Sequence, residues 1–299
     1  MKIITKIKEM QQISLLEKSN GNKISVVPTM GYLHKGHLSL VEKAKNFSEI
    51  TIVTLFVNPT QFAPNEDYSK YPRDFKRDVE LCEKAGVNYL FMPDALEMYP
   101  IGFSAKINIG RVTEDFEGKF RPFHFEGVAT IVAKLLNSTL PNFAVFGQKD
   151  YQQSLLVKKI VADLNFPLDI IVAPTLRESD GLAMSSRNIY LSDEDRLEAS
   201  ILFVSLEKAR NAIENGERNR KIINAIMHKT LRSVKNLRID YASSALADTL
   251  ESPDEFLPGE TIVLLLAVYL GKTRLIDNTI LKIPSILKSN NSAFEEFKA

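Results

Sequence analysis

The sequence predicts an α/β protein in which a doubly wound, mainly parallel sheet is followed by a second, smaller α+β domain. Over the first half of the chain, short apolar runs alternate with amphipathic helical patterns, as they do in βαβ units. Past about residue 175, two helical stretches precede three consecutive strand patterns. A length of 299 residues also favours two domains, since one domain takes roughly 150 residues. We therefore expect domains at residues 1–175 and 176–299, with the boundary near Pro174.

Strands of the first domain are expected where apolar runs end at turn residues. The first, Ile24 to Val27, ends at Pro28 and leads into a periodic helical pattern. The second, Ile50 to Val57, runs into an Asn-Pro-Thr-Gln turn. Four more strands are expected at residues 89–92, 105–109, 143–146 and 168–172, with helices near 75–85, 127–138 and 151–162.

The second domain is expected to contain helices near residues 193–215 and 219–234. Its strands are expected at 237–243, 261–270 and 273–277. The polar residues from Lys288 onward are predicted to be a frayed tail.

Composition excludes several classes of protein. The 38 Lys and Arg against 37 Asp and Glu leave a net charge of +1, which argues against disorder and against a nucleic-acid partner. The single cysteine, Cys82, excludes an internal disulfide and a zinc site with several thiolates. The longest apolar run, Ile262 to Leu270, is far shorter than the roughly 20 residues of a membrane span. We therefore expect a soluble, cytoplasmic protein with no membrane partner.

The segment PTMGYLHKGH, residues 28–37, follows the first predicted strand directly. His34 and His37 are three residues apart, so both lie on one side of a first helical turn, beside free N–H groups and the positive dipole end. This is a plausible phosphate site, and Gly31 and Gly36 would let ligand atoms approach the backbone. Alternatively, the pair only caps the helix or faces solvent. A shared metal ion is also open, but the carboxylate motif of zinc hydrolases is missing, which disfavours catalytic zinc.

The HxGH pattern at the start of a helix resembles the nucleotide-binding motif of the Rossmann-like nucleotidyltransferases and class I aminoacyl-tRNA synthetases. Four further segments narrow the resemblance, namely FVNPTQF at residues 56–62, YPRD at 71–74, FGQKDYQQ at 146–153 and DGLAMSSRN at 180–188. In this order, and over nearly the whole chain to Ile283, they resemble the pantoate–β-alanine ligases, the pantothenate synthetase family.

The resemblance implies an ATP- and Mg²⁺-dependent ligase of pantothenate and coenzyme A biosynthesis, acting as a homodimer. Pantoate and ATP would form a pantoyl adenylate with loss of pyrophosphate, and the amine of β-alanine would then displace AMP. Both steps develop charge on phosphate oxygens or a leaving phosphate, so positioning and cationic side chains matter more than a protein nucleophile.

The resemblance also implies residue roles. Catalysis falls to His34, His37, Lys149 and Arg187, with His37 as the general acid. Pantoate needs amide donors beside an apolar wall. Met30, Phe56 and Phe62 are candidates for the wall. The implied ATP site comprises Met30, Gly31, Tyr32, Leu33, His34, Lys35, Gly36, His37, Gly147, Gln148, Lys149, Asp150, Leu176, Met184, Ser185, Ser186 and Arg187, and the substrate site comprises Asn58, Gln61, Tyr71 and Gln153.

Other assignments are less direct. Gln61 would be shared between pantoate and β-alanine, and Asp150 would contact the nucleotide or a metal. The metal ligands are unknown, with Asp78 as a candidate near the metal, and residues 117–121 match a family loop. Gln148 stands where the family usually has Glu, and Leu176 where it usually has Val; both are expected to present backbone to the nucleotide.

Three residues are expected to be structural. Cys82 should be a buried apolar residue rather than a nucleophile, His124 should make a structural hydrogen bond, and His228 should be solvated.

Three alternatives remain at this point. Another nucleotidyltransferase of the superfamily would use the same histidines, but the amides suit a small hydroxy acid. A non-catalytic nucleotide-binding protein would not need His34, His37, Lys149 and Arg187 intact. A tRNA synthetase is disfavoured by the balanced charge and by the lack of an anticodon-binding extension.

The smaller domain is expected to close as a lid through a hinge near Pro174.

Overall fold

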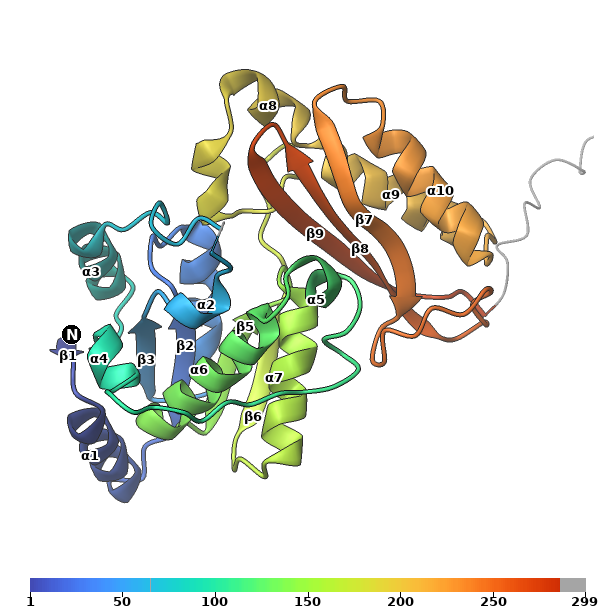
Figure 1. The fold of residues 1–299 in the computed structure, drawn as a ribbon. Helices are drawn as coiled ribbons and strands as arrows, with labels where there is room; N and C mark the ends of the chain where they lie inside the picture. The colour runs from blue at the N-terminus through green and yellow to red at the C-terminus, as the bar shows by residue number, and fades with distance from the viewer. Residues whose placement is uncertain (65, 286–299) are drawn as a thin grey trace, which may run out of the picture. The chain divides into compact units, whose positions relative to one another are not determined.

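The computed structural model describes residues 1–64 and 66–285, and the chain divides into two compact units at Ile189/Tyr190 (Figure 1). The predicted frayed tail from Lys288 onward lies outside the described residues.

The first unit is built on a parallel sheet of six strands in the order β1-β4-β3-β2-β5-β6. This confirms the predicted doubly wound fold. Strand order reverses at β2, because β3 and β4 lie on one side of it and β5 and β6 on the other. The strands are β1 (Lys2–Ile4), β2 (Ile24–Thr29), β3 (Ile50–Leu55), β4 (Tyr89–Phe91), β5 (Phe143–Gly147) and β6 (Asp169–Ala173).

Two strand assignments differ from the sequence-based expectation. Residues 105–109 form no strand; the N–H of Ile107 donates to the hydroxyl of Thr130, and Ile107 and Ile109 pack beside the core as an extended cover. The run is apolar because it covers the core, not because it joins the sheet. Strand β1 was not predicted, because it has only three residues and the first two are exposed. It therefore lacks the buried apolar run that indicates a strand.

Helices cover both faces of the sheet (Figure 1). Val26 and Ile52 face a core with α1 (Ile7–Ser19), α6 (His124–Thr139) and α7 (Tyr151–Asp163). Their neighbours Val27 and Val53 point the other way, to α2 (Lys35–Lys45) and α3 (Phe75–Lys84), as strand alternation requires. The short elements are η1 (Pro59–Gln61), α4 (Ala95–Met98), α5 (Glu117–Phe120) and η2 (Ser186–Tyr190).

The boundary between the units lies beyond the predicted position near Pro174. After β6 the chain doubles back, with an antiparallel bridge between Arg177 and Ala183. The hydroxyl of Ser186 then lies 3.2 Å from that of Tyr71, which attaches this segment to the first unit. The first unit therefore ends at Ile189 rather than at residue 175.

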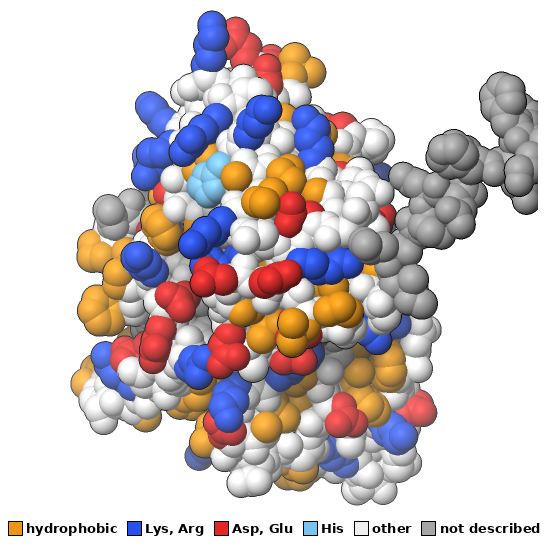
Figure 2. Space-filling view, turned by 90° about the vertical axis from the view of Figure 1, so that its right-hand side faces the viewer, with side chains coloured by type: hydrophobic (Ala, Val, Ile, Leu, Met, Phe, Trp, Pro, Cys, Tyr) orange, Lys and Arg blue, Asp and Glu red, His pale blue; other side chains and the backbone are white. Residues whose placement is uncertain are grey.

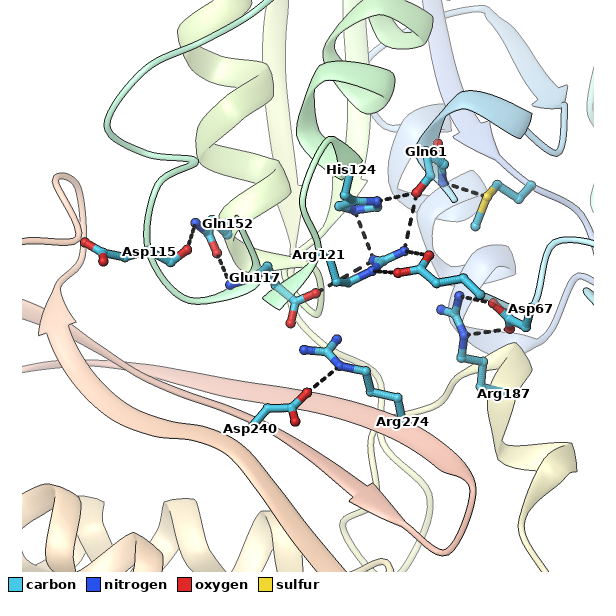
Figure 3. A network of polar contacts seen from close by, with 12 residues as sticks. Gln61, Asp67, Asp115, Glu117, Arg121, His124, Gln152, Arg187, Asp240 and Arg274 are labelled. Carbon is cyan, nitrogen blue, oxygen red and sulfur yellow. Dashed lines mark hydrogen bonds and ion pairs between the residues drawn. The ribbon is translucent and has the colours of Figure 1, made fainter. Parts of the chain in front are cut away.

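The second unit is the predicted α+β unit, with a three-stranded antiparallel sheet in the order β7-β8-β9. The expected helix at 193–215 is interrupted near Ala199 and Ser200 and forms two helices. Arg274 reaches across the sheet to Asp240, 2.9 Å away (Figure 3). The elements are α8 (Asp193–Glu198), α9 (Ile201–Glu214), α10 (Arg220–Leu231), β7 (Leu237–Leu246), β8 (Thr261–Leu270) and β9 (Thr273–Lys282).

The second unit carries a basic surface. A shallow hollow on α10 is lined by Lys221, His228, Lys229 and Arg232, among others. On the face drawn in Figure 2, positive side chains gather around a histidine. His228 was predicted to be solvated, but it is half-buried, and this burial lowers its pKa.

Cys82 is fully buried, as predicted, and burial raises the pKa of its thiol to about 12, so it is a packing residue. Within residues 1–64 and 66–285, no helix combines the length and the hydropathy that crossing a membrane requires.

Candidate active site

A pocket opens where β2 and β5 end, at the point where the strand order reverses. Ligands of open parallel sheets bind at this position because loops from neighbouring strands diverge there. His34 and His37 enter the pocket from the loop and helix after β2, and Lys149 and Gln153 enter from those after β5. All residues that line it belong to the first unit.

The two histidines cap the start of α2 through hydrogen bonds to its backbone. His34 is the N-cap, and its Nδ1 accepts a hydrogen bond from the N–H of Gly36 at 3.1 Å. The Nδ1 of His37 accepts from the N–H of His34 at 3.3 Å, and the two ring centroids are 4.0 Å apart. Gly36 leaves room for this arrangement, because a Cβ there would lie 2.8 Å from the ring of His34 and the ring would have to shift.

These hydrogen bonds determine where the imidazole protons lie. Since each Nδ1 accepts from a backbone N–H, the proton of each neutral ring is on Nε2. Burial, followed by the charge of Lys149, lowers the pKa of His34 to about 4. Burial, followed by the neighbouring His34, lowers the pKa of His37 to about 3. At neutral pH the pair therefore offers two Nε2–H donors, which favours hydrogen-bond donation over an imidazolium acid.

The loop before α2 is held by Asp78 of α3. Its two carboxylate oxygens accept from the N–H groups of Tyr32 and Leu33, at 2.8 and 2.7 Å. The side chain is fully buried, and burial raises its pKa although the two N–H groups stabilise the charged form. Both oxygens of Asp78 thus accept from the loop that carries the histidines. Its place near a metal stays a prediction.

The loop after β5 supplies a cation and an amide. Lys149, Asp150 and Gln153 line the pocket, with Lys149 partly enclosed and Asp150 exposed. The N–H of Gln148 donates to the carbonyl of Ala173 at 2.8 Å, which continues the pairing of β5 and β6 by one residue. Gln148 itself does not line the pocket.

The segment around η2 brings a second set of groups. Ser185, Ser186 and Arg187 all line the pocket. The guanidinium of Arg187 makes two hydrogen bonds to Asp67, at 3.1 and 3.2 Å (Figure 3). It also lies 5.8 Å from the ring centre of Tyr71. Asp67 was not among the predicted site residues; an acidic side chain in a polar loop gives no sequence signal for pairing with an arginine 120 positions away.

The turn after β3 supplies the amides. The side-chain N–H of Asn58 donates to the Oε1 of Gln61 at 3.1 Å and to the carbonyl of Gly127 at 3.1 Å. The Nε2 of Gln61 lies 2.9 Å from the sulfur of Met30. Asn58 and Gln61 are both buried and both line the pocket, so their amides are held in fixed positions beside the histidine loop.

The apolar wall of the pocket comes mainly from α6, which the sequence reading did not assign to the site. Val128, Ile131, Val132 and Leu135 line the pocket together with Phe56. Their spacing of three, four and seven residues is that of one helix face, and this is the signal that would have found them. Phe62, predicted as part of the wall, does not line the pocket.

The structure brings most of the predicted residues together. Those that line the pocket are Met30, His34, Gly36, His37, Asn58, Gln61, Tyr71, Gly147, Lys149, Asp150, Gln153, Leu176, Met184, Ser185, Ser186 and Arg187. Gly31, Tyr32, Leu33 and Lys35 shape the histidine loop without lining the pocket. Pro28, Thr29, Leu40, Phe146, Pro174 and Thr175 also line it and were not predicted.

Paired histidines at a helix start, at the switch point of a doubly wound sheet, define a nucleotide-binding α/β protein of the HxGH class. The sequence model of one family in particular, described as pantoate-beta-alanine ligase, matches residues 2–280. The chain belongs to the pantoate-beta-alanine ligase family.

Individual relatives agree with this assignment. The chain is 48% identical over 283 residues to the pantothenate synthetase of Caldicellulosiruptor saccharolyticus, an alignment that covers 95% of this chain and 100% of that relative. Its fold is similar to the crystal structure of the Thermus thermophilus pantothenate synthetase, with a TM-score of 0.88, 41% identity and coverage of 95% and 100%. The Francisella tularensis ligase, complexed with beta-gamma ATP and beta-alanine, gives a TM-score of 0.71 at 35% identity, with coverage of 94% and 97%.

Proposed function

We propose that this protein is a pantothenate synthetase that joins pantoate to β-alanine at the expense of ATP, with AMP and pyrophosphate as the other products. The observation that carries the proposal is one pocket lined both by His34 and His37, whose Nε2 atoms carry the ring protons, and by the amides of Gln61 and Gln153. Membership of the family supports the reaction, and the relative complexed with beta-gamma ATP and beta-alanine supports ATP as co-substrate.

In the first step, a carboxylate oxygen of pantoate attacks the α-phosphorus of ATP, and pyrophosphate leaves with the electron pair of the broken P–O bond. The histidine pair donates to the phosphate oxygens, and Lys149 and Arg187 offset the charge that develops on them. The product is a pantoyl adenylate. Arg187 must exchange its two hydrogen bonds with Asp67 for phosphate oxygens, which the shared fork geometry allows.

In the second step, the neutral amine of β-alanine attacks the acyl carbon of the adenylate, AMP leaves with the electron pair of the broken C–O bond, and the nitrogen releases one proton as the amide forms. Gln61 and Gln153 are proposed to hold the hydroxyl and carboxyl groups of pantoate, while the α6 wall takes its two methyl groups. Because that wall is buried and apolar, it also keeps water from the acyl adenylate.

Mg²⁺ is proposed to enter with ATP. Among the described residues no group of three or more His, Cys, Asp or Glu side chains is placed to hold an ion. Mg²⁺ commonly uses one or two carboxylates together with substrate phosphates, and the exposed Asp150 beside Lys149 fits that pattern. When bound, the ion would neutralise phosphate charge.

Three further assignments stay proposals, the first from the family resemblance, the second from composition and the third from fold analogy. These are a homodimer, a cytoplasmic location, and a lid role for the second unit. Because the first unit extends to Ile189, the hinge of such a lid is proposed after that residue rather than near Pro174. Scattering profiles with and without ATP test the lid, since identical compact profiles would contradict it.

Isotope exchange tests the reaction directly. Purified protein with ATP, Mg²⁺ and labelled pyrophosphate is expected to incorporate label into ATP only when pantoate is present. Addition of β-alanine should then yield AMP and pantothenate. Exchange driven by a different acid would keep the mechanism and change the substrate. ATP binding without exchange would favour the alternative of a non-catalytic nucleotide-binding protein.

The other alternative, a nucleotidyltransferase that leaves the nucleotide on its product, is distinguished by the product. It predicts a stable adenylylated compound rather than free AMP. An apolar wall that shares the pocket with two amides suits a small branched hydroxy acid, which favours the ligase.

A further inference from the structure

His124 lies just behind the pocket, at the first residue of α6, and is buried. Its Nδ1 is 2.8 Å from the backbone carbonyl oxygen of Gln61, and its Nε2 is 3.1 Å from a guanidinium nitrogen of Arg121 (Figure 3). His124 itself does not line the pocket. It therefore contacts the backbone of a proposed substrate residue without being able to contact the substrate.

The partners of His124 fix its protonation. A guanidinium only donates, so the Nε2 of His124 must accept from Arg121. The proton is then on Nδ1 and is donated to the carbonyl of Gln61. Burial and the charge of Arg121 lower the pKa of His124 to about 4, consistent with a neutral ring.

Arg121 is in turn fixed by Glu66. Its Nε and one terminal nitrogen donate to the two oxygens of Glu66, at 2.8 and 2.7 Å, and Glu117 lies 3.7 Å away. Bidentate pairing sets the plane of the guanidinium and leaves one nitrogen directed at His124. Glu66, Arg121 and His124 thus form a chain that ends on the carbonyl oxygen of Gln61.

The region around Gln61 has little freedom to move otherwise. A Cβ at Gly127 would lie 2.4 Å from the carbonyl oxygen of Thr60 and 2.7 Å from the nitrogen of Gln61, so α6 packs directly on η1. Asn58 holds the side-chain oxygen of Gln61. The carbonyl oxygen of Gln61 also accepts from a terminal nitrogen of Arg121, at the longer distance of 3.5 Å. The 2.8 Å hydrogen bond from His124 is therefore the shorter of the two that orient the peptide group after Gln61, and with it the Cα that carries the amide.

We propose that His124, oriented by Arg121 and Glu66, is a positioning residue that sets the direction in which Gln61 presents its amide to pantoate. This inference rests on the proposed function. Removal of the histidine is therefore expected to weaken the binding of pantoate. ATP binding should be unchanged, because the groups proposed to bind ATP are on other loops.

The test is a double-mutant cycle between His124→Leu and Gln61→Ala, with kcat and the KM of pantoate and of ATP measured for each variant. His124→Leu is expected to raise the KM of pantoate about tenfold, the size of one lost hydrogen bond, and to leave the KM of ATP within about twofold. In the Gln61→Ala background the same change should have no further effect. His124→Asn, whose amide can take the place of Nδ1–H, should recover most of the loss.

His228→Leu is the matched control, since it removes a histidine in the second unit. The positioning role would be overturned if the effects of His124→Leu and Gln61→Ala on the KM of pantoate multiply in the double variant. It would also be overturned if His124→Leu raises the KM of ATP as much as the KM of pantoate. If His124→Leu does not fold, Arg121→Lys carries the same cycle, with smaller expected effects. If the wild-type protein does not turn over pantoate, both the proposed function and this inference are overturned. If the wild-type protein is active and His124→Leu has the same kcat and KM of pantoate, only the inference is overturned.

Discussion

The Nδ1 of His37 accepts a hydrogen bond from the backbone N–H of His34, at 3.3 Å, while the Nδ1 of His34 accepts from Gly36. The motif thus uses its own backbone to orient both rings. Each ring is left with an Nε2–H group in a pocket that also holds Lys149 and Arg187.

Replacement of His37 by Ala is expected to lower kcat by about 100-fold or more, since one preorganised donor to developing charge is lost. The free energy of unfolding should change little by comparison. Lys149→Ala should behave in the same way. Steady-state kinetics and thermal unfolding measure both quantities, with Lys43→Ala on the exposed part of α2 as the control. Unchanged turnover in His37→Ala and Lys149→Ala would refute the assignment of this site.

Gln153→Ala is expected to raise the KM of pantoate about tenfold with a smaller effect on kcat, because its amide is proposed to bind ground state and transition state alike. The KM of ATP should stay close to the wild-type value. A variant in which kcat falls and the KM of pantoate is unchanged would remove Gln153 from the substrate site.

Asp78→Asn tests the anchoring of the histidine loop. An amide has one oxygen, so one of the N–H groups of Tyr32 and Leu33 loses its acceptor and faces an NH₂ group instead. We expect a loss of about 1–3 kcal/mol in the free energy of unfolding, together with a raised KM of ATP. Titration of Mg²⁺ separates this role from metal binding: the Mg²⁺ dependence at saturating ATP should be unchanged, and a weakened Mg²⁺ response would support a place near the metal.

Gly127→Ala is expected to destabilise the protein by about 1–3 kcal/mol and to raise the KM of pantoate, because the added methyl group would overlap the backbone of η1. Gly110→Ala is the matched control, since a Cβ there has its nearest neighbour 3.8 Å away. Denaturant unfolding compares the two. Equal stabilities would show that η1 can move away from α6.

Stability should fall as the pH drops from about 6.5 toward 4. The pKa values of His34 and His124 are lowered to about 4 and that of His37 to about 3, so in this window the unfolded chain binds protons that the folded chain does not. The stabilising difference is fully present above the ordinary histidine pKa and is lost below it. Thermal unfolding at pH 7, 6, 5 and 4.5 measures this. His124→Asn should reduce the slope, and an identical slope would contradict a buried neutral ring.

The sequence by itself determined the fold class and the order of the site segments. Alternating apolar runs and helical patterns define a doubly wound sheet, because strand and helix periods record which side of each element is buried. The same periodicity could not tell residues 105–109, which cover the core, from a strand, nor place the unit boundary at Ile189. The segments after β2 and β5 were assigned to one site because parallel strands end at the same edge.

Only the tertiary structure decided which side chains support those segments. Asp78 reaches Tyr32 from 46 positions away, and His124 reaches Gln61 from 63. The α6 wall and the contact of Gly127 with η1 also join distant parts of the chain. Local sequence patterns show which side of a segment is buried and which hydrogen bonds the segment forms within itself. The partner that a polar group finds across the fold depends on the paths of loops, which no local period encodes.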